Sequence, residues 1–188
     1  MGQLTTSTRA GRVAVMMTAA ALTFGVAGCG FASSEATVIA EINVSSPQLR
    51  DEAPLPADYS CKKPPGVSPP LRWSSEPLPR AKSIAIVADN SAPSESAVHW
   101  VLYNIDPRTT ELGEDAASSP PDDSGQARVT GGKAGYEAPC SPTGNYRFTV
   151  YALSGRVDVK EGAPLPEILK KIADQTIARG RLTAVHIE

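Results

Sequence analysis

In the stretch YRFTVYAL, residues 146–153, every second side chain is apolar, from Tyr146 through Phe148 and Val150 to Ala152. A period of two is typical of a β-strand with one face against a core. The apolar runs 82–89 and 99–105 are rich in β-branched residues, as buried strands are. Residues 37–44 and 181–187 also alternate, and we expect strands there that open and close the domain. With 17 prolines and 15 glycines among 188 residues, the sequence predicts a mainly β fold.

One helix is expected near the C-terminus. One face of residues 167–179 carries five apolar side chains: Ile168, Leu169, Ile172, Ala173 and Ile177. This spacing predicts an amphipathic helix, and Pro166 and Gly180 stand where proline and glycine commonly start and stop one. The polar segment 107–136 separates two predicted strands, and loops of this length are usually functional or mobile.

The first 28 residues predict export. Residues 1–12 contain two arginines and no acid, and residues 13–28 are apolar and uncharged. These are the n-region and h-region of a secretory signal peptide. The apolar run of 16 residues is shorter than the roughly 20 that span a bilayer as a helix, so a permanent transmembrane anchor is less favoured.

The signal peptide ends at a lipidation motif. Val26-Ala27-Gly28-Cys29 matches a bacterial lipobox, in which the cysteine accepts a diacylglyceryl group before cleavage. We therefore expect residues 29–36 to be the lipidated cysteine and a flexible tether, and residues 37–188 to form one domain on the extracytoplasmic face of the cell membrane. An ordinary signal peptide with a cysteine at its cleavage site and an uncleaved anchor are the alternatives.

Two cysteines remain once Cys29 carries lipid. Cys61 and Cys140 would lie in a compartment that permits disulfides. Pairing them would close a long loop and remove much unfolded-state entropy. Two buried free thiols are the alternative, because sequence does not supply the Cα distance that pairing requires.

Composition argues against several function classes. The net charge is −2 and the basic residues are scattered, so no surface for nucleic acid is indicated. No serine stands in a Gly-x-Ser-x-Gly motif, and the two histidines, His99 and His186, do not form a zinc motif with the cysteines. We therefore expect no enzymatic activity, no cofactor and no metal.

Six stretches in order carry a resemblance to a known family. They are LPADYSC (55–61), SPPLRW (68–73), SIAIVAD with AP (83–89, 92–93), HW with YNI (99–100, 103–105), GY with PCSP (135–136, 139–142) and FTVYAL (148–153). From residue 37 to its end the chain resembles the phosphatidylethanolamine-binding protein family, in its bacterial branch. The resemblance implies an antiparallel β-sandwich of two sheets with a short C-terminal helix, long irregular loops and a small anion pocket at one end.

The resemblance also implies which residues line that pocket. Asp89 matches the family's first acid, Pro93 its closing proline and His99 its imidazole. Tyr136 and Pro139 match the lower wall of the pocket. The ligand implied is phosphate or a phosphorylated head group. We expect Asp89 to orient His99 and to raise the pKa of its ring.

The chain departs from the family pattern at several of these positions. Ser91 replaces the second acid, Asn90 the first proline and Ala138 a glycine, and the segment 142–146 is shorter and lacks a histidine. Ser91 weakens repulsion of an anion, whereas the missing histidine removes a donor. A merely structural hydrogen bond between Asp89 and His99, in a pocket that binds nothing, is the alternative.

Two functions are compatible with the sequence. The first is a membrane-anchored module that binds a small anion or a phospholipid head group. The second is an interaction protein that inhibits or regulates an envelope protease, kinase or other partner through surface loops 47–70 and 107–132. The sequence indicates no oligomeric state and does not identify the ligand or the partner.

Overall fold

The computed structural model describes residues 2, 39–74, 80–91 and 96–187. The chain divides into two units, residues 1–36 and 37–188. The predicted signal peptide, the lipidation site at Cys29 and the tether lie outside the described residues. No helix in the described part of the chain is long and apolar enough to cross a membrane.

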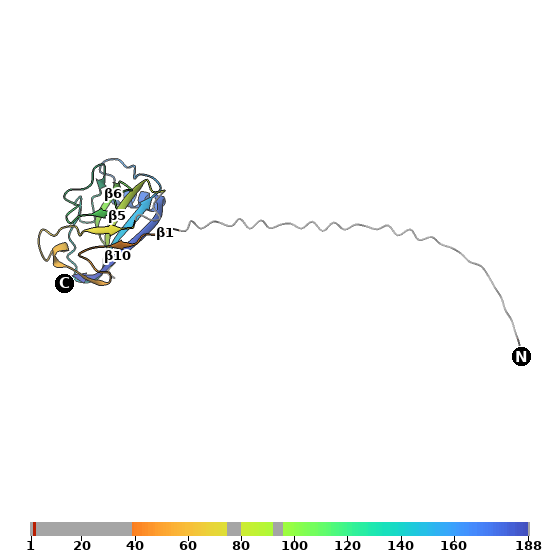
Figure 1. The fold of residues 1–188 in the computed structure, drawn as a ribbon, viewed down its shortest axis with the longest axis horizontal. Coiled ribbons are helices and arrows are strands. Elements are labelled where there is room, and N and C mark those ends of the chain that lie inside the picture. The colour runs from red at the N-terminus through yellow and green to blue at the C-terminus, as the bar shows by residue number, and fades with distance from the viewer. Residues whose placement is uncertain (1, 3–38, 75–79, 92–95, 188) are drawn as a thin grey trace. The chain divides into compact units, whose positions relative to one another are not determined.

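The second unit is built on two β-sheets (Figure 1). The larger sheet has seven strands: β1 (Ala40–Glu41), β3 (Ala53–Leu55), β5 (Ser83–Ser91), β6 (Val98–Ile105), β8 (Gly125–Gln126), β9 (Asn145–Leu153) and β10 (Thr176–Ile187). Its order is β1-β10-β9-β5-β6-β8, and β3 pairs with β10 off this path. The smaller sheet is β2-β4-β7, from β2 (Val44–Ser45), β4 (Leu71–Trp73) and β7 (Glu111–Leu112). The remaining elements are the 3-10 helix η1 (Ala57–Tyr59) and α1 (Leu165–Gln175).

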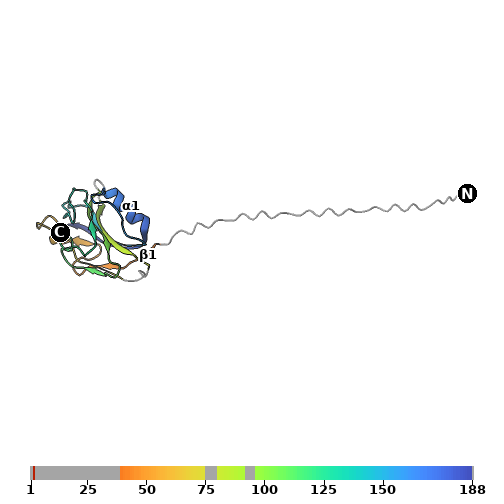
Figure 2. The same cartoon turned by 90° about the horizontal axis from the view of Figure 1, so that it is seen from above.

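The two faces of the larger sheet pack against different partners. Ile84, Ile86 and Ala88 of β5 belong to the main core, which includes residues of the smaller sheet such as Trp73. The intervening side chains, such as Val87, pack in a second cluster with Ile168 and Ile172 of α1. Figure 2 shows α1 against one side of the larger sheet. The prediction of a mainly β, two-sheet sandwich with one short helix is confirmed, with the addition that β1 and β3 run parallel to β10.

The helix is shorter than predicted. It ends at Gln175, and β10 begins at Thr176, which pairs with Leu153 of β9. The hydroxyl of Thr176 donates to the carbonyl of Ile172 over 2.7 Å, at the end of α1. Ile177, expected on the apolar face of the helix, instead packs against the main core from β10. Pairing with β9 on both sides of an irregularity at Ile177 satisfies backbone groups of these residues, which outweighs the local helical pattern.

The strand predicted at residues 37–44 is also wrong in extent. The structure has two short strands there, β1 in the larger sheet and β2 in the smaller one, so the chain changes sheets at Ile42 and Asn43. Ile42 is 2% exposed, which explains why the alternation continues across the crossing. The long segment 107–136 contributes β7 and β8 and is not uniformly irregular.

Candidate functional site

A β-bulge in β6 sets the direction of His99. Ala88 of β5 pairs with Trp100, and the next residue, Asp89, pairs with Val98, so His99 is an extra residue in β6. Bulges of this kind redirect a side chain relative to the regular alternation. His99 thus leaves the regular alternation and lines a hollow at this end of the sheet.

The hollow beside His99 has a volume of about 350 Å³. It is formed by the end of β5, the start of β6 and two loop segments. Its lining residues are Asn90, Ala97, Val98, His99, Thr130, Gly131, Glu137, Ala138, Cys140 and Ser141. The size suits a small polar molecule or the head group of a larger one.

The ring of His99 is held on two sides. Its Nδ1 lies 3.1 Å from the carbonyl oxygen of Glu137, and the Glu137 amide donates to the carbonyl of His99 over 2.8 Å. The ring of Tyr146 meets it edge-on, with centroids 5.8 Å apart. With Nδ1–H donating to that carbonyl, Nε2 is the acceptor of the neutral ring and becomes a donor on protonation.

Asn90 supplies the second polar group of the hollow. Its side chain is buried, and its Oδ1 accepts from the amide of Ala97 over 2.8 Å. Among the described residues no acceptor binds the Nδ2 hydrogens of Asn90, which are therefore available to a ligand. The sequence indicated Asn90 only as a departure from the family pattern, although its alternation with Ile86 and Ala88 already places it on their face of β5.

Asp89 lies on the other face of β5, so the expectation that it orients His99 is wrong. Its Oδ1 accepts from Nε of Arg147 over 2.6 Å, and both side chains are about a quarter exposed, at 26% and 28%. The hydrogen bond that Arg147 donates to Asp89 raises the pKa of the Arg147 guanidinium. Asp89 pairs across the sheet with Arg147, so the two side chains share one face. Strand alternation decides on which face of β5 the Asp89 side chain lies, and a motif match carries no information about faces.

Pro93 lies outside the described residues, and the other predicted ligand contacts are not in the lining of the hollow. Ser91 is exposed at the end of β5. Tyr136 is buried, packs edge-on against Trp100 with centroids 6.1 Å apart, and donates its hydroxyl to the Tyr59 carbonyl over 2.6 Å. Burial raises the pKa of Tyr136. Pro139 is buried between Ala138 and Cys140, which line the hollow, but does not line it itself.

Glu137 adds a carboxylate that the sequence reasoning missed. Its Oε2 accepts from the amide of Gly131 over 3.1 Å, which joins the two loops of the hollow. The hollow therefore combines an imidazole and an amide with one acid. Such a set can donate to an anion through His99 and Asn90 and can also attract a cationic group.

The predicted disulfide between Cys61 and Cys140 is confirmed. The two Cα atoms lie 5.2 Å apart. The amide of Cys61 also donates to the carbonyl of Pro139 over 3.0 Å. The bond fastens the loop that carries Ala138 and Ser141, and thus one wall of the hollow, to the segment after η1.

Comparison with known proteins gives the family. The sequence model of the family described as "PBP: Phosphatidylethanolamine-binding protein" matches residues 45–187. A UPF0098 protein of Methanothermobacter thermautotrophicus is 33% identical over 150 residues, which cover 77% of this chain and 98% of that protein. The chain therefore belongs to the phosphatidylethanolamine-binding protein family.

One further relative is named as a lipoprotein, and two solved structures share the fold of this chain. A Mycobacterium tuberculosis protein that bears the name lipoprotein LppC is 33% identical over 155 residues, covering 80% of this chain and 75% of that protein. The crystal structure of Escherichia coli YbcL matches with a TM-score of 0.71 and 26% identity, covering 79% of this chain and 99% of that one. The structure of the homologue CT736 from Chlamydia trachomatis gives 0.67 and 29%, covering 80% and 99%.

Proposed function

We propose that this domain binds a small anion or a phospholipid head group in the hollow beside His99, at the outer face of a membrane to which Cys29 anchors it. The observation that carries the proposal is the bulge that directs His99 toward the hollow that Asn90 also lines. Imidazole and amide N–H groups are suitable donors for phosphate oxygens. The name of the family supports binding of a phospholipid head group, and the name of the relative, lipoprotein LppC, supports the lipid anchor.

The acid in the hollow narrows the ligand. A dianion alone would be repelled by Glu137, whereas a zwitterion could place its phosphate near His99 and Asn90 and its ammonium near Glu137. Phosphoethanolamine has this charge arrangement. We therefore favour a zwitterionic phosphate ester over inorganic phosphate.

Binding rather than catalysis fits the polar groups present. Thr130 and Ser141 are the hydroxyl-bearing residues of the lining. Thr130 Oγ1 accepts from the amide of Val98 over 2.9 Å, and Ser141 Oγ donates to the carbonyl of Thr143 over 3.0 Å. The Nδ1 of His99 is engaged with the carbonyl of Glu137. A nucleophile activated by a base is held within reach of that base, whereas the hydroxyl of Ser141 is engaged within its own loop.

The test is a thermal shift of the domain 37–188, which is one of the two compact units of the chain. Phosphoethanolamine at about 100 times its Kd should add about 2.7 kcal/mol of stability. That corresponds to a rise in Tm of roughly 5–11 °C for a domain of this size. His99→Ala and Asn90→Ala should abolish the shift.

Two variants serve as matched controls. His186→Ala removes the other histidine, which is exposed on β10, and Asp89→Asn alters the acid on the opposite face of β5. Both should keep the shift of the unmodified domain. A shift that survives His99→Ala, or that Asp89→Asn removes, would contradict the assignment of the ligand to this hollow.

A further inference from the structure

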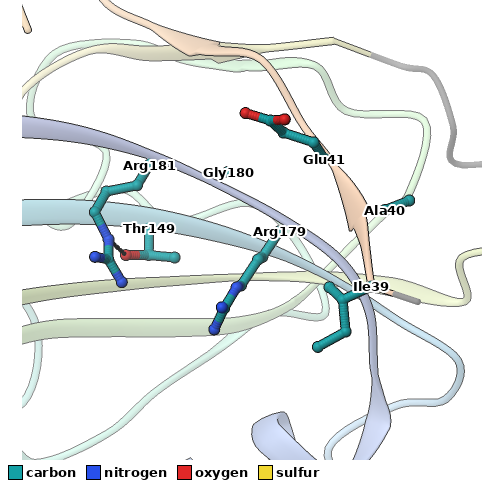
Figure 3. A pocket seen from close by; sticks show the side chains of 7 residues that line it. All are labelled: Ile39, Ala40, Glu41, Thr149, Arg179, Gly180 and Arg181. Atoms are coloured by element: carbon teal, nitrogen blue, oxygen red, sulfur yellow. Dashed lines mark hydrogen bonds between the residues drawn. The ribbon is translucent and has the colours of Figure 1, made fainter. Parts of the chain in front are cut away.

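A second hollow lies on the other side of the larger sheet, where β1, β9 and β10 meet (Figure 3). Its volume is about 370 Å³, and its lining includes Arg179, Arg181 and Thr149. Register places Arg181 opposite Thr149 and Arg179 opposite Tyr151, so these side chains share one face. Neither arginine is part of the hollow beside His99.

The positive charge of the two arginines is not neutralised locally. Nε of Arg181 donates to Oγ1 of Thr149 over 3.1 Å, and no carboxylate in the described part of the chain pairs with Arg179 or Arg181. The acid in the lining is Glu41, and its carboxylate points away from both guanidinium groups (Figure 3). By contrast, Arg72 and Arg108 are also exposed, but they are paired with Glu111 and Asp106.

The hydroxyl group of Thr149 can donate a hydrogen bond into the hollow. The residue is 2% exposed, and its oxygen accepts from Arg181. Within the described residues its hydroxyl hydrogen has no acceptor. A buried donor without an acceptor costs free energy, so a ligand oxygen that accepts from this hydroxyl would recover that cost on binding.

We propose that Arg179, Arg181 and Thr149 form a second anion site, for the phosphate group of a phosphate ester. Alternate residues of a strand are about 6.6 Å apart along its axis, so two guanidinium groups can hold different oxygens of one phosphate. The hydroxyl of Thr149 can donate to a third oxygen. This arrangement suits a tetrahedral anion better than a planar carboxylate.

The apolar part of the lining indicates an ester with an organic group. Ile39 and Ala40 form this wall, and Ile39, at 43%, is the most exposed large apolar side chain of the described residues. The phosphate could belong to a free ester or to an anionic lipid. Ile39 follows the predicted lipidated Cys29 by ten residues, a tether of at most about 35 Å, so lipid head groups are within reach.

The experiment uses the domain 37–188 in a His99→Ala background, so that binding beside His99 does not contribute. One arm measures glycerol 3-phosphate by calorimetric titration. The other measures sedimentation with phosphatidylglycerol vesicles against phosphatidylcholine vesicles. Arg179→Gln with Arg181→Gln should weaken binding at least tenfold in whichever arm shows it, and Thr149→Val should weaken it by a smaller factor.

The matched control is Arg72→Gln with Arg108→Gln, which removes the same charge from paired positions. It should leave binding within a factor of two. Loss in the ester arm identifies a soluble ligand, and loss in the vesicle arm alone identifies a lipid. No binding in either arm, or an equal effect of both double variants, would overturn the proposal. Because the background lacks His99, either result is independent of the function proposed above.

Discussion

Removing the disulfide tests how far the crosslink, rather than the core, stabilises the domain. Cys61 and Cys140 are 79 residues apart in sequence. A crosslink over that interval lowers unfolded-state entropy by about 15 cal/mol/K, which is about 4.5 kcal/mol at 25 °C. Because engineered and native bonds often deliver less than this bound, Cys61→Ser with Cys140→Ser should cost between about 2 and 4.5 kcal/mol.

Urea unfolding of the domain 37–188 measures this cost. The m-value should rise together with the loss of stability, because the unfolded chain is more expanded without its crosslink. Reductant added to the unmodified domain should reproduce the double variant, since the chain's third cysteine, Cys29, is not part of this domain. A loss under about 1 kcal/mol with an unchanged m-value would refute the reasoning.

Two further predictions concern the packing of the sheets and the buried tyrosine. Gly180→Ala should cost about 1–3 kcal/mol in urea unfolding, because its Cβ would overlap the carbonyl of Ile42, whereas Gly113→Ala, with nothing within 4 Å, should be near neutral; equal costs would contradict this. The raised pKa of Tyr136 stabilises the fold fully below pH 10, and above it the unfolded state alone ionises, so stability should fall by about 1.4 kcal/mol per pH unit from this group. Tyr136→Phe should reduce the decline between pH 10 and 11 by about 1 kcal/mol, because the unfolded tyrosine is only half ionised at pH 10; an unchanged decline would count against it.

Much of the fold could be predicted from local sequence. The alternation of residues 146–153 marks β9, and the apolar runs mark most of β5 and β6. Pairing of Cys61 with Cys140 was one of two alternatives that the predicted export and the number of cysteines allowed, and the structure confirms it. These predictions succeeded because they depend on side-chain periodicity and composition, which a strand or a thiol carries wherever it lies in the fold.

The site was predicted less well, because a motif match names positions without their faces. His99 was placed in the pocket, whereas Asp89 was assigned to it although its carboxylate binds Arg147 on the opposite face. Asn90, one residue further, lies in the hollow that Asp89 was expected to line. A bulge in β6 or a step of one residue along β5 changes which side chain lines the hollow. Neither feature can be recognised from composition.

The sequence by itself determined that the chain carries a β-rich domain, an amphipathic helix and two cysteines able to pair. Only the tertiary structure decided where that helix gives way to β10, which face of β5 each polar residue occupies, and that Arg179 and Arg181 meet Thr149. The reason is physical. Periodicity is a property of one segment, whereas register, bulges and the end of a helix are set by hydrogen bonds to strands distant in sequence.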